Sequence, residues 1–267
     1  MIAVMLILLL FSMTGCGKTN VKELAGTESD EAAQVSEAAD ANDAFEANES
    51  NASPQSGEQS QSIISQEIPD TDCIYSYLQG IKSYEKGKEW TGAWCYEEAA
   101  GQQFSAFGCG ICCLSNMYST FSGKAYDPGE MYVYAKEHSS YAPDSGIGAI
   151  GWSDIVSLTE QMGCSVSLQT MGDYESFCQQ VGQAQTTMVL VSSNNDDTIW
   201  KDLPGHYVNI WCYNANTDEV FMTDSKGPSR NRTWVALSDI YKALKTSSEY
   251  QYMTVNSYDA NQDVINR

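Results

Sequence analysis

Positive charge and histidine are both scarce in this sequence. Its 267 residues include 14 lysines and arginines against 35 aspartates and glutamates, so the net charge is −21, and only two residues are histidine. Recognition of a nucleic-acid backbone needs clustered lysines and arginines. The chain also has no glycine-rich phosphate loop, no internal repeat and, after its first residues, no further apolar span. We therefore do not expect nucleic acid as a partner.

The first residues form one short apolar run, Ile2 to Met13, which ends in Thr14-Gly15-Cys16. Such a run is too short to span a bilayer as a stable helix, and small residues follow it, as in a secretory signal. The cysteine directly after Gly15 resembles the lipobox of bacterial lipoproteins, which implies cleavage before Cys16 and lipid attachment to this residue. We therefore expect a lipoprotein signal peptide over residues 1–15 and a protein anchored on the extracytoplasmic face of the cell membrane.

The segment that follows is polar and acidic. Between Gly17 and Asp70 there are twelve acidic residues and two lysines, and Phe45 is the only aromatic residue. A stretch with so little apolar surface cannot offset the entropy lost on ordering, so it stays solvated. We expect residues 16–70 to be a lipid-anchored, disordered linker that holds a domain away from the membrane.

Residues 71–267 are rich in tyrosine, tryptophan and phenylalanine and are long enough for one hydrophobic core. We expect one α+β domain, with helices first and an antiparallel sheet after them, and a monomer. Periodicity and capping residues predict the following elements: helices over 109–123, 127–136, 153–163, 173–181 and 238–244, and strands over 187–191, 206–213, 220–223 and 250–255.

Cys109 and His206 are the candidate reactive pair. Cys109 lies in Gly108-Cys109-Gly110 at the predicted start of a helix, and His206 opens a predicted strand after a Pro-Gly turn. A thiol becomes a fast nucleophile only as the thiolate, and a nearby imidazole or a helix N-terminus lowers its pKa. The glycines on both sides of Cys109 allow close approach of a substrate, which a core cysteine does not need. These observations favour a cysteine peptidase.

The order of three motifs strengthens this interpretation. Gly-Cys-Gly opens a helix, Gly-His-Tyr-Val starts a strand, and Met-Thr-Asp ends the next strand at Asp224. This order resembles papain-like cysteine peptidases, in particular those that process the double-glycine leaders of bacteriocins. The resemblance implies that Cys109 is the nucleophile, His206 the base and Asp224 the residue that orients the imidazole. It also implies cleavage of a peptide after small residues, without a cofactor or a metal.

The papain-like group commonly uses a glutamine to stabilise the oxyanion. Gln103 lies six residues before Cys109, at the spacing that the resemblance implies, and its neighbour Gln102 is an alternative. Gln79 is a further rival, because some relatives carry this glutamine near the start of the domain. We prefer Gln103 to Gln79.

Other assignments for the site residues stay open at this stage. Asn209, Asn214 and Asp218 are alternatives to Asp224 as the orienting residue. His138 is expected to lie at a solvated helix end.

The other cysteines suggest a second class of function. Cys109, Cys112 and Cys113 have the spacing of a redox dithiol or part of a metal site, although no strand precedes them and the remaining cysteines are single. The simplest disulfide for this sequence joins Cys73 and Cys95.

Two alternatives to a leader-type peptidase also remain. A surface lipoprotein with this fold could be a catalytically silent binding module. A wall-peptide hydrolase of the NlpC type fits the expected location as well as a peptidase that acts on a secreted peptide.

Overall fold

A six-stranded antiparallel sheet forms the centre of the computed structural model, which describes residues 70–193 and 199–265. The strand order is β3-β8-β4-β5-β6-β7, and every neighbouring pair is antiparallel. The strands are β3 (Cys164–Gln169), β4 (Thr186–Val191), β5 (His206–Asn214), β6 (Glu219–Thr223), β7 (Thr233–Ala236) and β8 (Tyr252–Tyr258).

Most of the helices come before the sheet in the chain. The described α-helices are α1 (Ile81–Glu85), α2 (Phe104–Phe107), α3 (Cys109–Ser122), α4 (Pro128–His138), α5 (Trp152–Gln161), α6 (Tyr174–Gln183) and α7 (Leu237–Ala243), of which α6 and α7 lie between strands of the sheet. Short 3-10 turns occur at Thr71–Cys73, Ala93–Tyr96 and Pro143–Ser145, and a small hairpin pairs β1 (Glu98–Ala99) with β2 (Gln102–Gln103). The expected α+β class, with N-terminal helices followed by an antiparallel sheet, is confirmed.

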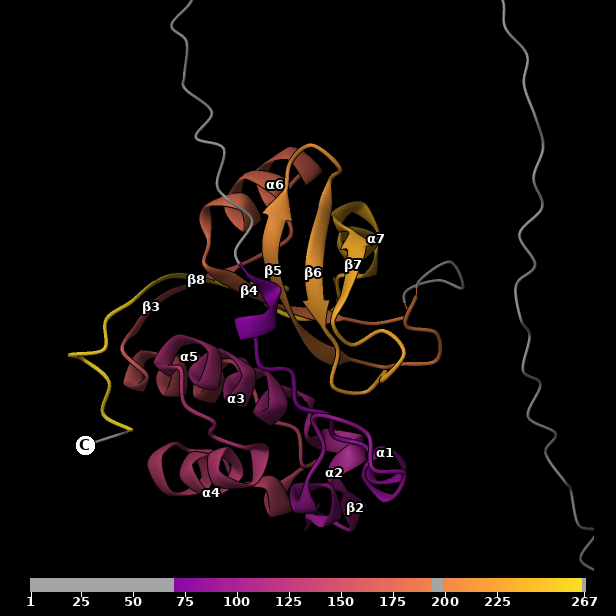
Figure 1. The fold of residues 1–267 in the computed structure, drawn as a ribbon, viewed down its shortest axis with the longest axis vertical. Coiled ribbons are helices and arrows are strands. Elements are labelled where there is room, and N and C mark those ends of the chain that lie inside the picture. The colour runs from indigo at the N-terminus through magenta and orange to yellow at the C-terminus, as the bar shows by residue number, and fades with distance from the viewer. Residues whose placement is uncertain (1–69, 194–198, 266–267) are drawn as a thin grey trace, which may run out of the picture. The chain divides into compact units, whose positions relative to one another are not determined.

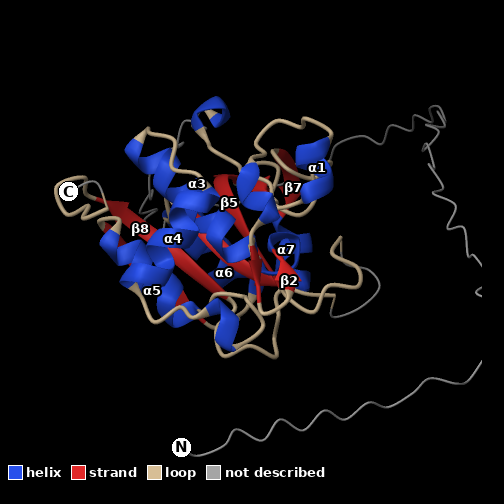
Figure 2. Cartoon of the chain, turned by 90° about the horizontal axis from the view of Figure 1, so that it is seen from below, coloured by secondary structure: helices blue, strands red, loops and turns tan. Residues whose placement is uncertain are grey.

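Helices cover both faces of the sheet (Figures 1 and 2). On one face α3 and α5 pack against side chains that include Met188 and Leu190 of β4. On the other face α6 and α7 pack against side chains that include Val189 and Val191. Successive residues of a strand point to opposite faces, so β4 is buried on both sides, and its last four residues, Met188 to Val191, form an unbroken apolar run.

The caps of two predicted helices are as expected, and one is not. Asp127 caps α4 in a capping box with Glu130, and Asp173 caps α6. Helix α5 was expected to be capped by Ser153, which is wrong: Gly151 is the N-cap, and Ser153 lies inside the first turn. Because Trp152 is buried at the start of this helix, tertiary packing rather than a polar cap decides where it begins.

The two edge strands, β3 and β7, were not predicted. The signal peptide expected over 1–15 and the linker expected over 16–70, apart from Asp70, lie outside the described residues. In the part of the chain that the structure describes, none of the helices combines the length and the hydropathy needed to cross a bilayer.

Candidate active site

Cys109 is the first residue of α3, with Gly108 as its N-cap. The positive end of a 14-residue helix therefore lies at this thiol and favours its thiolate. The flanking glycines also have a packing role. A Cβ on Gly108 would lie 2.3 Å from the ring of Phe104, and one on Gly110 would lie 2.4 Å from a methyl of Ile150. Close packing around the helix start therefore requires glycine at both positions.

His206 is the first residue of β5, which packs directly against α3. One contact between these elements is a buried hydrogen bond of 3.2 Å from Asn116 Nδ2 to Asn209 Oδ1. The imidazole Nε2 of His206 lies 2.8 Å from Asp224 Oδ1, and the ring also hydrogen-bonds the thiol of Cys109. Because Nε2 is occupied by the carboxylate, Nδ1 is the ring nitrogen left to bond the sulfur. The structure thus brings these three side chains into one chain of contacts.

Asp224 directly follows β6, beside the start of β5 in the antiparallel pair. Its side chain is fully buried and accepts hydrogen bonds from five described donors. Oδ1 accepts from His206 and from the backbone N–H groups of Lys226 and Gly227, and Oδ2 accepts from Trp200 Nε1 and Arg230 Nε, each at 3.1 Å. A buried carboxylate with this many donors is held in its charged form.

Electrostatics favour an ion pair between the thiol and the imidazole. Burial raises the pKa of the Cys109 thiol, but the hydrogen bond and positive charge of His206, with backbone hydrogen bonds from Tyr207 and Gly110, outweigh burial and lower it. Burial lowers the pKa of His206, but Asp224 and Cys109 raise it to about 9. Burial likewise raises the pKa of Asp224, and His206 and Arg230 hold it well below its ordinary value. Near neutral pH these pKa shifts favour a thiolate on Cys109 and an imidazolium on His206.

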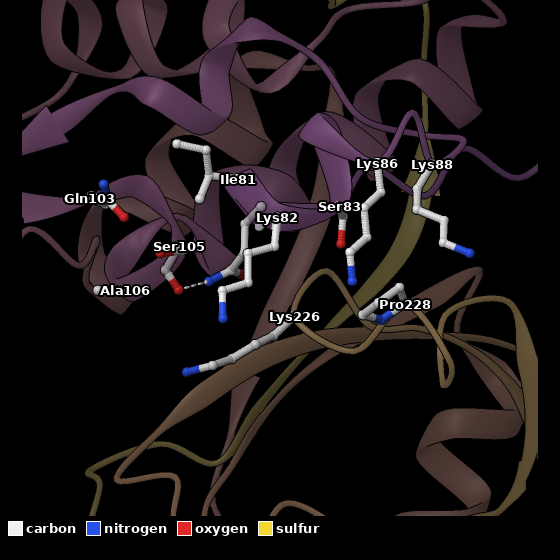
Figure 3. A pocket seen from close by; sticks show the side chains of 12 residues that line it. Ile81, Lys82, Ser83, Lys86, Lys88, Gln103, Ser105, Ala106, Lys226 and Pro228 are labelled. Atoms are coloured by element: carbon white, nitrogen blue, oxygen red, sulfur yellow. Dashed lines mark hydrogen bonds between the residues drawn. The ribbon is translucent and has the colours of Figure 1, made fainter. Parts of the chain in front are cut away.

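The candidate oxyanion residues differ in burial. Gln79 is 1% exposed, and its amide is fixed at both ends, because Nε2 donates to Ser105 O at 2.7 Å and Oε1 accepts from Ser225 Oγ at 2.6 Å. Gln103 and its neighbour Gln102 are exposed on β2. Gln79 and Gln103 line one pocket, and Figure 3 draws the bond to Ser105 as a dashed line. Gln79 is thus buried with its amide held in one orientation, whereas Gln103 is exposed.

The other predicted candidates lie elsewhere. Asn209 bonds Asn116, Asn214 caps the following turn, and Asp218 accepts from the hydroxyls of Tyr174 and Tyr213. Among the described residues, Asp224 is the carboxylate that contacts the His206 ring.

His138 ends α4 as an exposed side chain that stacks on Tyr134, with the ring centroids 4.2 Å apart. Its expected place at a solvated helix end is confirmed.

The neighbouring cysteines have a different environment from Cys109. Burial raises the pKa of Cys112 and of Cys113 well above the ordinary value, and the charge of Cys109 raises it further. All eight described cysteines are free, so the predicted Cys73–Cys95 disulfide is wrong: Cys95 is buried, with its sulfur 3.6 Å from Leu78 O, whereas Cys73 is exposed. Among the described residues, no three His, Cys, Asp or Glu side chains are placed to hold a metal ion.

Two contacts of the site were not found from the sequence. Trp200 is 1% exposed and donates its indole N–H to Asp224, and Arg230 pairs with the same carboxylate from a half-buried position. Neither residue belongs to a motif, and each reaches Asp224 only through the folding of a loop. The sequence carries no local signal for either contact.

No protein-family model matches the sequence, and no curated protein matches it. Among solved structures, the chain is similar to the peptidase domain of Streptococcus ComA, a bi-functional ABC transporter involved in a quorum sensing pathway, with 14% identity and a TM-score of 0.39 over 55% of this chain and 90% of that one. It is also similar to a protein from Bacillus anthracis described as a C39-like peptidase, with 13% identity and a TM-score of 0.37 over 57% of this chain and 90% of that one. At such low sequence identity neither structure shows what this chain does.

Proposed function

We propose that this protein is a cysteine peptidase with a papain-like arrangement of Cys109, His206 and Asp224. The observation that carries the proposal is the continuous contact from the thiol at the start of α3, through the imidazole at the start of β5, to the buried carboxylate after β6. A structural cysteine needs no such partners, whereas a nucleophile needs a base, and the base needs a residue that orients it.

The mechanism follows from the orientation of the histidine. The Cys109 sulfur attacks the carbonyl carbon of the scissile bond, and His206, which faces it through Nδ1, holds the proton of the thiol. This proton passes to the leaving amine as the tetrahedral intermediate collapses to the thioester. A water, activated by His206, then hydrolyses the thioester. Asp224 keeps the ring in place through Nε2 and stabilises its positive charge.

The oxyanion needs donors that are in position before the reaction. We assign this role to the side-chain amide of Gln79 together with the backbone N–H of Cys109. Gln79 is supported by its burial and by the hydrogen bonds to Ser105 and Ser225 that fix its amide. Exposed Gln103 lacks such support among the described residues.

Turnover of peptides by the full chain tests the proposal. A mixture of linear peptides that includes double-glycine sequences, and a separate digest of bacterial wall peptides, would be incubated with the protein and with Cys109→Ala. We expect new peptide termini, found by mass spectrometry, only with the unchanged protein. The mixture that yields them distinguishes a linear-peptide peptidase from a wall-peptide hydrolase. Cleavage of neither, with a native fold, would favour a binding module instead.

We also propose that the enzyme is held on the extracytoplasmic face of the membrane by lipid on Cys16. The support is the Thr14-Gly15-Cys16 sequence after the apolar run. Metabolic labelling with an alkyne fatty acid tests this. Incorporation is expected in the unchanged chain and absent in Cys16→Ala, and equal labelling of both would contradict the anchor.

A further inference from the structure

Four lysines surround the pocket beside the candidate active site. Lys82 lies on α1, Lys86 and Lys88 follow that helix, and Lys226 comes from the loop after β6. The pocket has a volume of about 630 Å³. Figure 3 shows these side chains reaching the same opening from two separate parts of the chain. They are a third of the 12 basic residues in 71–267, a region that has 23 acidic ones.

The lining of this pocket carries positive charge without a paired carboxylate among the described residues. No aspartate or glutamate lines it, and none of its four lysines takes part in an ion pair there, whereas Lys242 elsewhere pairs with Asp239. Positive charges gathered at a concave surface raise the local concentration of anions.

The lining of the pocket includes one of the residues proposed for catalysis. Gln79 lines it, together with Ser105, whose carbonyl holds the Gln79 amide. Lys226 lines it too, and the backbone N–H of Lys226 donates to Asp224 at 2.9 Å. A second hollow, of about 470 Å³, shares Lys226 and adds Arg230 and another lysine, again without a carboxylate in its lining. Basic side chains therefore extend on both sides of Lys226, next to the triad.

We propose that this pocket binds aspartate or glutamate side chains of an acidic peptide substrate, and so determines which peptides reach Cys109. The proposal rests on the proposed peptidase function. A peptide fits better than a nucleic acid, because no aromatic side chain lines the pocket to stack on bases, whereas the lysines, serines and amides there suit carboxylates.

Binding can be measured without turnover. The full chain carrying Cys109→Ala would be titrated into a fluorescein-labelled peptide that contains four glutamates, and into the same peptide with four glutamines, with anisotropy as the readout. We expect the glutamate peptide to bind more tightly and to lose affinity as salt screens the charges. Because the four lysines are exposed, Lys82→Gln with Lys226→Gln should weaken binding by about two- to twenty-fold.

A matched variant controls for net charge. Lys124→Gln with Lys242→Gln removes the same charge from exposed positions outside the pocket, and it should leave the affinity within about 1.5-fold. Equal weakening by both double variants, or equal binding of the glutamate and glutamine peptides, would overturn the proposal. Binding of tetrathymidylate as tight as that of the glutamate peptide would also overturn the assignment to a peptide.

A second measurement separates this proposal from the peptidase function. The full chain with its native cysteine would be inactivated by a peptidyl vinyl sulfone with glutamate residues and by iodoacetamide. A preference for the glutamate inhibitor that the pocket variants lose, with unchanged iodoacetamide labelling, supports the pocket. Fast iodoacetamide labelling, without a preference for the glutamate inhibitor, would support the peptidase function and refute the proposed role of the pocket. Lysine-dependent peptide binding without Cys109 reactivity would support the pocket and refute the peptidase.

Discussion

Replacing Asp224 by asparagine should remove the negative charge that holds His206, while nearly preserving the shape of the site. The carboxylate accepts from the His206 ring, the Trp200 indole, the Arg230 guanidinium and two backbone N–H groups. An asparagine has one acceptor oxygen and presents an NH₂ donor to some of these donors. The variant therefore removes a negative charge and leaves buried donors without an acceptor.

The size of the effect follows from the pKa of His206. Burial alone lowers this pKa, yet the hydrogen bond to Asp224 and the other charges of the site bring it from 6.5 to about 9. A change of one in a pKa corresponds to about 1.4 kcal/mol. Breaking a buried pair by removing one partner typically costs about 3–5 kcal/mol of stability. We expect Asp224→Asn to lose an amount in this range.

The pH dependence of this loss has a definite sign. A raised histidine pKa stabilises the fold fully below the unfolded value of about 6.5, and this contribution disappears as the pH rises through about 9. The lowered pKa of Asp224 adds stability above its ordinary value and loses it as the pH falls through the lowered one. The difference between the unchanged protein and Asp224→Asn should therefore be greatest near pH 5–6.5 and shrink toward pH 9.

Two assays measure these quantities. Urea denaturation at several pH values gives the difference in unfolding free energy. Ring resonances in NMR spectra give the histidine titration, and the chain has only two histidines, so exposed His138 serves as an internal reference. We expect the pKa of His206 to fall from about 9 toward or below 6.5 in Asp224→Asn. A value within about half a unit of the unchanged protein would refute the reasoning.

Three further predictions concern single side chains. Gln79→Ala should lower kcat by about 100-fold, as loss of an oxyanion donor does, while Gln103→Ala should change kcat less than about twofold. The reverse result would make Gln103 the oxyanion donor. Trp200→Phe keeps most of the buried ring but removes a donor to a charged group, so urea denaturation should show a loss of about 1.5–3 kcal/mol, and an unchanged stability would mean that this hydrogen bond contributes nothing. Gly163 has φ +86°, and a Cβ there would lie 2.4 Å from the carbonyl oxygen of Asp259; Gly163→Ala should therefore lower the free energy of unfolding by about 1–3 kcal/mol, and an unchanged urea midpoint would contradict this.

The sequence predicted the elements whose signals are local. Helices α4 and α6 carry aspartate caps, and Met188 to Val191 of β4 are all apolar because both faces of this strand are buried. The two edge strands lack such signals: β3 has mostly half-buried positions, and β7 is four residues long. Their pairing depends on neighbours that lie far away in the chain.

The candidate site shows the same division. Cys109, His206 and Asp224 could be found because each stands in a short motif at an element boundary. The choice between Gln79 and Gln103 could not be made from spacing, because spacing does not tell which amide is buried. The basic pocket could not be predicted from the sequence either. Lys226 comes close to lysines that lie about 140 residues earlier in the chain only when the chain folds.

Labelling of Cys109 with iodoacetamide across pH tests the central claim most directly. Cys109 is only 7% exposed, so access limits its absolute rate, but the pH midpoint of the rate depends on its thiolate and not on access. We expect this midpoint to lie below about 8.5 in the full chain and to rise in His206→Ala, with exposed Cys73 as the reference thiol in the same digest. A midpoint that is unchanged by His206→Ala would contradict the thiolate–imidazolium pair.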